Sequence, residues 1–159
     1  MSQRIKYPKD QTQFFSTLMK RTNSYFEEKN ISKNANIWMV LKSIVILTTL
    51  VSSFTAILLG VFNDNLPIVF LLWGITGFFG ALAAVNIGHD AIHGSYSSNP
   101  LVNKILSHSF NFMGASAYLW KIMHNQAHHM HTNVEGKDED LETLPIIRFS
   151  PTQKYMNIH

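Results

Sequence analysis

Two long stretches of this sequence contain no charged residue, and they limit what the chain can fold into more than any other feature. Residues 44–62 give 19 uncharged positions and residues 66–88 give 23. A helix needs about 20 apolar residues to cross the hydrocarbon core of a membrane. Only residues 63–65, with the sequence Asn-Asp-Asn, separate the two stretches. The pattern therefore predicts a transmembrane helical hairpin over residues 38–88, in preference to a buried hairpin in a soluble protein.

The composition favours a membrane protein over an ordinary soluble domain. Charged residues make up 14% of the 159 positions, against about 25% in a typical soluble domain. The length suits a single domain. The chain has no cysteine, which excludes disulfide bonds, thiolate metal sites and cysteine nucleophiles. We therefore expect an all-α membrane protein built from the transmembrane hairpin and interfacial helices.

Basic residues are concentrated before the first apolar stretch. Residues 1–37 hold seven Lys and Arg against three acidic residues, whereas the remainder holds six against seven. Lys- and Arg-rich segments stay in the cytoplasm, so both ends of the hairpin are expected there. Basic residues beside an apolar block fit a membrane surface better than nucleic acid, and no nucleic-acid partner is expected. Within this cytoplasmic segment, apolar spacing predicts an amphipathic helix over about residues 11–29, which either lies on the membrane or packs on the domain.

Residues 89–159 form the third predicted region. Residues 95–100 predict a loop. From there to residue 123 the mixture of apolar and polar side chains is too polar for another span and predicts a helix in the membrane interface, anchored by Trp120 and Lys121. This placement keeps the histidines before and after that helix on one side of the membrane. The acidic residues that follow are expected in a solvated loop, with docking of a basic electron carrier as the less favoured interpretation. They are Glu135, Asp138, Glu139, Asp140 and Glu142.

Two histidine clusters, HDAIHG and HNQAHH, stand out in this region. Residues four apart lie on one face of an α-helix, so His89 and His93 can hold one ion together, as can His124 and His128. His129 is five residues from His124, about 140° around an ideal α-helix. It is therefore expected to bind a second ion or to lie where the helix ends. Ionisable groups are costly at a membrane face and tend to be functional there, so metal binding is the favoured interpretation.

The number of histidines also narrows the choice of metal. Imidazole binds Zn, Cu, Fe and Ni, but a catalytic zinc site usually shows HExxH, and here Asp90 stands in place of that Glu. Two clusters supply too many ligands for one tetrahedral zinc, which favours paired iron. Asp90 is expected either to orient an imidazole or to act only as a helix-terminus charge. For His131, the role of a polar loop residue is favoured over that of a metal ligand. His108 is expected to face lipid headgroups.

With these residues in view, the sequence resembles the membrane fatty acid desaturases, whose first two histidine boxes match HDAIHG and HNQAHH. The acidic continuation is similar to the acyl-CoA or acyl-lipid branch, which includes the linoleoyl-CoA and front-end types. The resemblance implies an integral membrane enzyme in which two irons and O₂ convert an acyl chain to its cis-unsaturated product. It implies that the iron ligands, and thus the catalytic residues, are His89, His93, His124, His128 and His129. Their boxes are expected on the cytoplasmic side.

The sequence also departs from the family pattern. The third box, HxxHH or QxxHH, and the His-Pro-Gly-Gly haem motif of a fused cytochrome b5 are both absent before His159. The resemblance therefore implies an N-terminal fragment with an incomplete domain, inactive by itself. A separate donor, a ferredoxin or a cytochrome b5, would supply electrons. A related histidine-box hydroxylase or ketolase, and a non-catalytic metal-binding module of the membrane, remain as alternatives.

Overall fold

The computed structural model describes residues 12–134, 137–138, 147–148, 151 and 154–157, and all regular secondary structure in that part is helical. The predicted all-α class is confirmed for these residues. The chain divides into two units, residues 1–33 and 34–159, which are described separately below.

The first unit contains helix α1 (Phe14–Glu28), which confirms the helix predicted near residues 11–29. The helix is amphipathic, and none of its residues is buried. After it, Asn30 adopts a left-handed conformation with φ of 50°. The exposed large apolar side chains of α1 are Phe14, Phe15, Leu18, Met19 and Tyr25. Whether they face a membrane or another part of the protein stays a prediction.

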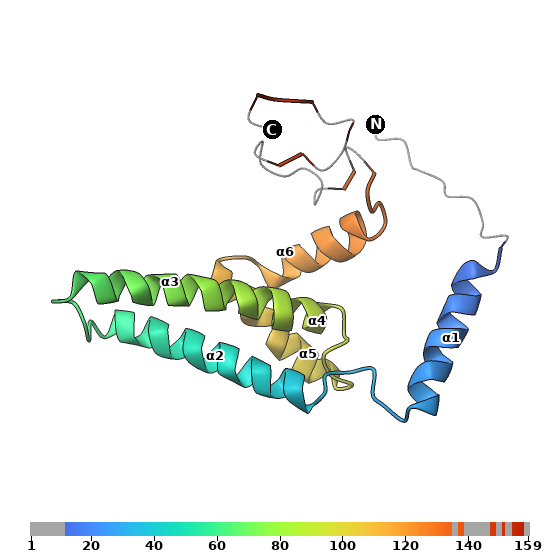
Figure 1. Cartoon of the computed structure of the whole chain (residues 1–159), viewed down its shortest axis with the longest axis horizontal. Helices are drawn as coiled ribbons and strands as arrows, with labels where there is room; N and C mark the ends of the chain where they lie inside the picture. Colours follow the sequence, from blue (N-terminus) through green and yellow to red (C-terminus); the bar gives the residue numbers. More distant parts are fainter. Residues whose placement is uncertain (1–11, 135–136, 139–146, 149–150, 152–153, 158–159) are drawn as a thin grey trace. The chain divides into compact units, whose positions relative to one another are not determined.

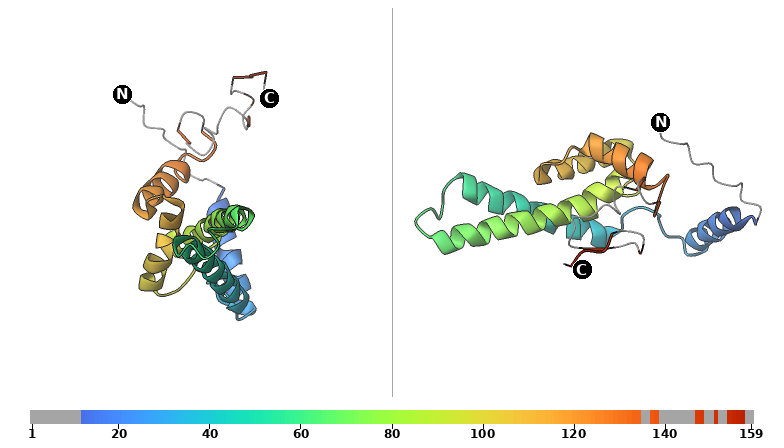
Figure 2. Two further views of the ribbon diagram at one scale, coloured as in Figure 1. Left: turned by 90° about the vertical axis from the view of Figure 1, so that its left-hand side faces the viewer. Right: turned by 90° about the horizontal axis from the view of Figure 1, so that it is seen from above.

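The second unit is organised by a hairpin of two long helices, which lie side by side in every view (Figures 1 and 2). Helix α2 (Ile37–Leu58) begins at Asn36, whose side chain accepts a hydrogen bond from the backbone N–H of Met39. Helix α3 (Leu66–Ala83) begins in the same way at Asn65. The segments η1 (Ala84–Gly88) and α4 (His89–Ile92) continue α3. Ile37–Leu58 and Leu66–Ile92 are both long and apolar enough to cross a membrane, which confirms the predicted pair.

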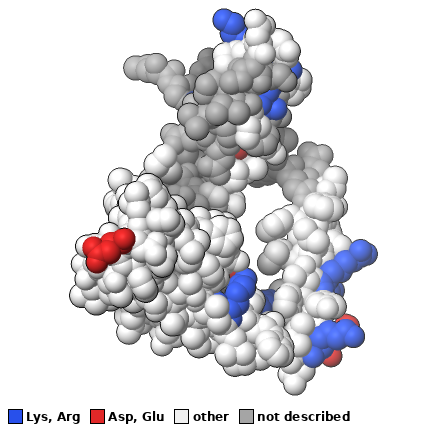
Figure 3. Space-filling model, turned by 60° about the vertical axis from the view of Figure 1, so that its left-hand side comes forward, with Lys and Arg blue, Asp and Glu red and all other residues white. Residues whose placement is uncertain are grey.

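Small polar side chains join the helices, while large apolar ones face outward. Thr76 Oγ1 donates to Ser53 Oγ across the hairpin at 2.9 Å, and Ser53 donates in turn to a carbonyl of its own helix. Buried core residues include Ile46, Leu50, Ala83, Ile87, Ala91 and Tyr96. On the outside, Trp38 is 75% exposed and Phe70 is 69% exposed. Much of the described surface visible in Figure 3 is uncharged. The exposed large apolar side chains of α2 and α3 are suited to lipid.

Short helices follow the hairpin where the sequence predicted one interfacial helix. They are α5 (Pro100–Ser107), η2 (His108–Met113), α6 (Ala117–Ile122) and η3 (Met123–His128). The helical region is divided because Gly114 adopts φ of 73°, a left-handed conformation that ends the first segment. Ser116 then begins α6 by accepting a hydrogen bond from Leu119 N–H. The chain therefore reverses before the second histidine box.

A close backbone contact fixes this reversal against the hairpin. Ser109 Oγ donates to the carbonyl of Ala83 at 3.2 Å, and both Ser109 and Phe110 are buried. A Cβ atom on Gly88 would lie 2.6 Å from Ser109 Oγ and 2.7 Å from a ring carbon of Phe110. Only glycine permits this approach, which brings the segment leading to the second box against the segment leading to the first.

Candidate metal centre

The first histidine box occupies the end of the long second helix. His89 and His93 are one turn apart, with their ring centroids at 4.6 Å, and the backbone N–H of His93 bonds to the carbonyl of His89. Asp90 Oδ1 lies 3.3 Å from His89 Nδ1, and both side chains are about one-third exposed. The helical spacing thus places both imidazoles on one face, as the sequence predicted.

The second box lies on a helix that widens from α to π geometry. His124 and His128 stack with ring centroids at 5.0 Å and planes 17° apart. The backbone N–H of His129 bonds to the carbonyl of His124 at 3.0 Å, five residues back. This wider turn brings residues five apart onto one side of the helix, and the rings of His124 and His129 approach to 4.7 Å. Of the two positions expected for His129, the structure shows the end of the helix, because His129 directly follows the last residue of η3 (Met123–His128).

The two boxes converge on one another. His124 lies 5.2 Å from His89 and 5.3 Å from His93, measured between ring centroids. His93 Nε2 and His129 Nε2 are 3.4 Å apart. One ligand nitrogen from each of His89, His93 and His124 lies within 4.8 Å of the other two. Helices distant in sequence thus gather imidazoles at one place.

The geometry and chemistry of this cluster fit a metal ion. Two nitrogens bound to one ion at about 2.1 Å each lie at most roughly 4.2 Å apart. The nitrogens of His89, His93 and His124 lie within 4.8 Å of one another, so small ring rotations would bring all three onto one ion. Imidazole is a common ligand of iron, zinc, copper and nickel. Burial, assisted by His89 and His129, lowers the pKa of His93 below its usual value of 6.5, against the opposing effect of Asp90. A neutral His93 offers the lone pair that a metal requires.

An aromatic stack covers one side of the cluster. Trp120 stacks on His124 with centroids 4.0 Å apart and on the buried Phe110 at 4.4 Å. Its ring also contacts His89 edge to face at 5.7 Å. The sequence predicted Trp120 as a membrane anchor and not this contact, although its position four residues before His124 indicates a shared helix face.

One acidic residue of the expected solvated loop is instead buried beside the second box. Asp138 is 1% exposed, and its Oδ1 lies 2.8 Å from His128 Nδ1. The prediction of a solvated position is therefore wrong for Asp138, because the chain folds back and brings this residue against His128 of the second box. The other acids of that run lie outside the described residues; they are Glu135, Glu139, Asp140 and Glu142.

Comparison with known proteins gives this histidine cluster its family. The model of the fatty acid desaturase family matches residues 64–158, which is more than half of the chain and includes both boxes. The chain belongs to the fatty acid desaturase family. This confirms the resemblance on which the sequence analysis relied.

Relatives of this desaturase-family chain include three proteins of comparable identity. The sn-1 linoleoyl-lipid 6-desaturase of Synechocystis sp. is 35% identical over 99% of this chain and 43% of its own length. The protein of the same name from Arthrospira platensis is 36% identical over 92% and 39%. The acyl-lipid (8-3)-desaturase of Mortierella alpina is 35% identical over 93% and 34%. The chain thus spans less than half the length of these relatives. No solved structure matches it significantly.

The resemblance to the desaturases implied five histidines as metal ligands, and the structure gathers all five in one region. Their role in binding metal stays a prediction.

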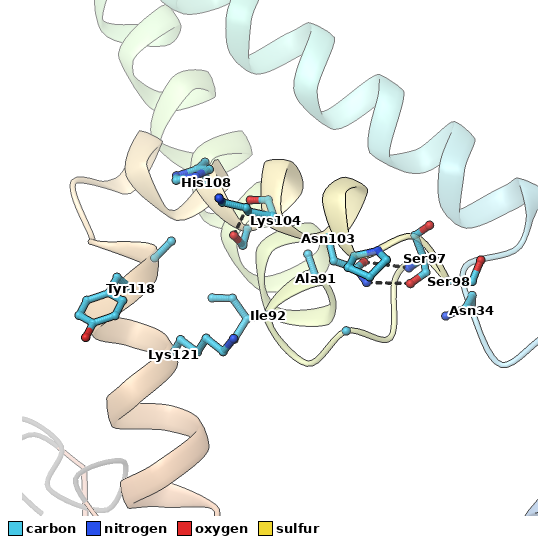
Figure 4. A pocket seen from close by; sticks show the side chains of 14 residues that line it. Asn34, Ala91, Ile92, Ser97, Ser98, Asn103, Lys104, His108, Tyr118 and Lys121 are labelled. Carbon is cyan, nitrogen blue, oxygen red and sulfur yellow. Dashed lines mark hydrogen bonds between the residues drawn. The ribbon is translucent and has the colours of Figure 1, made fainter.

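A separate open pocket of about 610 Å³ lies among α4, α5 and α6 (Figure 4). Ala91 and Ile92 give it apolar walls, and Lys104, His108 and Lys121 supply its basic groups. None of the five histidines is among the residues that line it. His108 therefore faces this pocket instead of the histidine cluster.

Proposed function

We propose that this chain provides the first two histidine boxes of an acyl-lipid desaturase that introduces a cis double bond into a fatty acyl chain. The observation that supports it best is the convergence of His89, His93 and His124 in a chain of the desaturase family. When bound, a pair of irons would supply the activation of O₂ needed to remove two hydrogens from neighbouring methylenes. The two substrate hydrogens, two electrons from a separate ferredoxin or cytochrome b5 and two protons from solvent would together reduce O₂ to two molecules of water.

The chain's own residues would hold and order this centre. His89 and His93 would present their nitrogens from the end of the second long helix, and His124, His128 and His129 from the π turn of η3. Trp120 and Phe110 cover one side of the cluster with apolar surface. An apolar wall excludes water and keeps the imidazoles in fixed orientations.

The substrate class follows from the relatives and from the hairpin. The relatives are named for linoleoyl-lipid and acyl-lipid substrates, which favours a membrane lipid over acyl-CoA. The second long helix continues into His89 and His93, and Lys42 in the first turns of α2 donates to Asn86 beside this end. Large apolar side chains of both helices are exposed. A lipid embedded beside the hairpin would reach the cluster without leaving the membrane. By the distribution of Lys and Arg, we place the boxes on the cytoplasmic side.

Expression in a lipid-producing host tests this proposal. The complete reading frame that contains this chain would be expressed. The fatty acids of the membrane lipids would be profiled, and the iron content of the purified protein would be measured. We expect a new cis-unsaturated fatty acid that disappears in the His93→Ala and His124→Ala variants, together with their bound iron. The matched control is His108→Ala, because His108 lines the separate pocket.

Three outcomes would contradict the proposal. A hydroxylated or oxygenated product would indicate the related hydroxylase or ketolase chemistry. Iron binding without any lipid product, when the chain is supplied with O₂ and an electron donor, would indicate a non-catalytic metal-binding module. Normal iron content in a His93→Ala/His124→Ala double variant would exclude the cluster as the metal site. Expression of the 159-residue chain alone would test the prediction that it is inactive by itself.

A further inference from the structure

A buried carboxylate holds one imidazole of the second box. Asp138 is 1% exposed, and its two oxygens contact different groups. Oδ1 lies 2.8 Å from His128 Nδ1, and Oδ2 accepts a hydrogen bond from the backbone N–H of Asn133 at 2.7 Å. Burying a carboxylate is costly unless hydrogen bonds compensate it. These two contacts supply that compensation and fix the carboxylate against the ring.

Residues 132–134 and 137–138, which the structure describes, make specific local contacts. Thr132 Oγ1 donates to the carbonyl of His128 at 2.9 Å, and Asn133 adopts φ of 63°. Asparagine tolerates this left-handed conformation better than most residues. The backbone N–H groups of Lys137 and Asp138 then both bond to the carbonyl of Val134. The chain thereby turns back and returns the carboxylate to the helix end that carries His128.

We propose that Asp138 is a positioning residue that fixes the tautomer and the orientation of His128. An ionised carboxylate only accepts hydrogen bonds, so His128 would carry its proton on Nδ1 and leave Nε2 for a metal. A carboxylate behind a ligating histidine also raises the basicity of the ring. The inference deepens the proposed function, on which it rests for the identity of the metal.

The first box offers a matched control. Asp90 lies 3.3 Å from His89 Nδ1, but that contact is longer and about one-third exposed. Water can replace a contact of this kind. Asp138 and Asp90 therefore test the same chemistry in a buried and in an exposed setting.

The decisive substitution is Asp138→Asn. The backbone N–H of Asn133 still requires an acceptor, so the amide oxygen at position 138 would stay there and the amide NH₂ would face His128 Nδ1. His128 would then move its proton to Nε2, the atom intended for the metal. Loss of such an outer partner typically weakens metal binding about 10- to 100-fold.

Two measurements on the full chain in detergent test this. In the metal-free protein, ¹⁵N NMR assigned with a His128→Ala variant should show His128 protonated on Nδ1, and on Nε2 after Asp138→Asn. Anaerobic titration with Fe²⁺ against a chelator should show about 10- to 100-fold weaker binding for Asp138→Asn. The Asp90→Asn variant should stay within about threefold of the unmodified chain. Adding Asp138→Asn to His128→Ala should cause no further loss.

Each result decides the inference separately from the proposed function. An Nε2–H tautomer of His128 in the unmodified chain overturns it, as does unchanged iron affinity after Asp138→Asn. Further loss of iron in the double variant would show that Asp138 acts on the fold and not through His128. If Asp138→Asn fails to fold by circular dichroism, the tautomer of the unmodified chain decides. If the unmodified chain binds no iron, the tautomer still tests the inference, and the proposed function is tested separately in the complete reading frame.

Discussion

Replacing Gly88 with alanine tests whether close packing of two backbone segments builds the histidine cluster. The added Cβ would lie 2.6 Å from Ser109 Oγ and 2.7 Å from Phe110, distances at which neighbouring groups must move. Gly77 is the matched control, because it lies in α3 of the same continuous helix and a Cβ there meets nothing within 4 Å. Both substitutions remove a helical glycine, which costs about 1 kcal/mol relative to alanine.

The difference between the two variants isolates the cost of overpacking. Gly77→Ala should raise the free energy of unfolding by up to about 1 kcal/mol. In Gly88→Ala the same stabilisation should be opposed by overpacking, which should lower the free energy of unfolding by roughly 1–3 kcal/mol. The two proteins should therefore differ by about 1–3 kcal/mol. Because His89 follows Gly88 directly, Gly88→Ala should also weaken Fe²⁺ binding, whereas Gly77→Ala should not.

Reversible unfolding in mixed micelles, followed by circular dichroism, measures these free energies. Fe²⁺ titration of the same samples measures the effect on the cluster. Equal stability and equal iron affinity for the two variants would refute the close approach of η1 and η2. In the structure, a Cβ added at Gly88 lies 2.6 Å from Ser109 Oγ. If Gly88→Ala were more stable than Gly77→Ala, the two segments would have to lie further apart than this.

Two further substitutions test the polar contacts of the hairpin. Thr76→Val removes the hydrogen bond to Ser53 and should cost about 0.6 kcal/mol, and at most roughly 1.7, in the same unfolding assay. A Ser52→Ala control, at an exposed position of the same helix pair, should have little effect. Tyr96→Phe removes the buried 2.8 Å contact with Ser43 and should lower stability by about 1 kcal/mol. Unchanged unfolding of this variant would show that the contact contributes nothing.

The histidine cluster shows where inference from local spacing ends. The four-residue separations correctly placed His89 with His93 and His124 with His128, since both pairs lie in helices. For His129 the same rule left two positions open, a second ion or the end of the helix, and the structure has it at the helix end after a π turn. No local pattern distinguishes α from π geometry.

The sequence by itself determined the hairpin, the helical class and the two histidine boxes. Long uncharged stretches and regular spacing are local properties, and they leave few alternatives once water or lipid is the solvent. Only the tertiary structure decided that Trp120 covers the histidines and that Asp138 is buried beside His128. Both depend on a chain that reverses at Gly114 and again after the second box. The four-residue spacing indicates that Trp120 shares a helix face with His124, but its contact with His89 and the return of Asp138 to His128 depend on how the chain turns, which spacing along one helix does not specify.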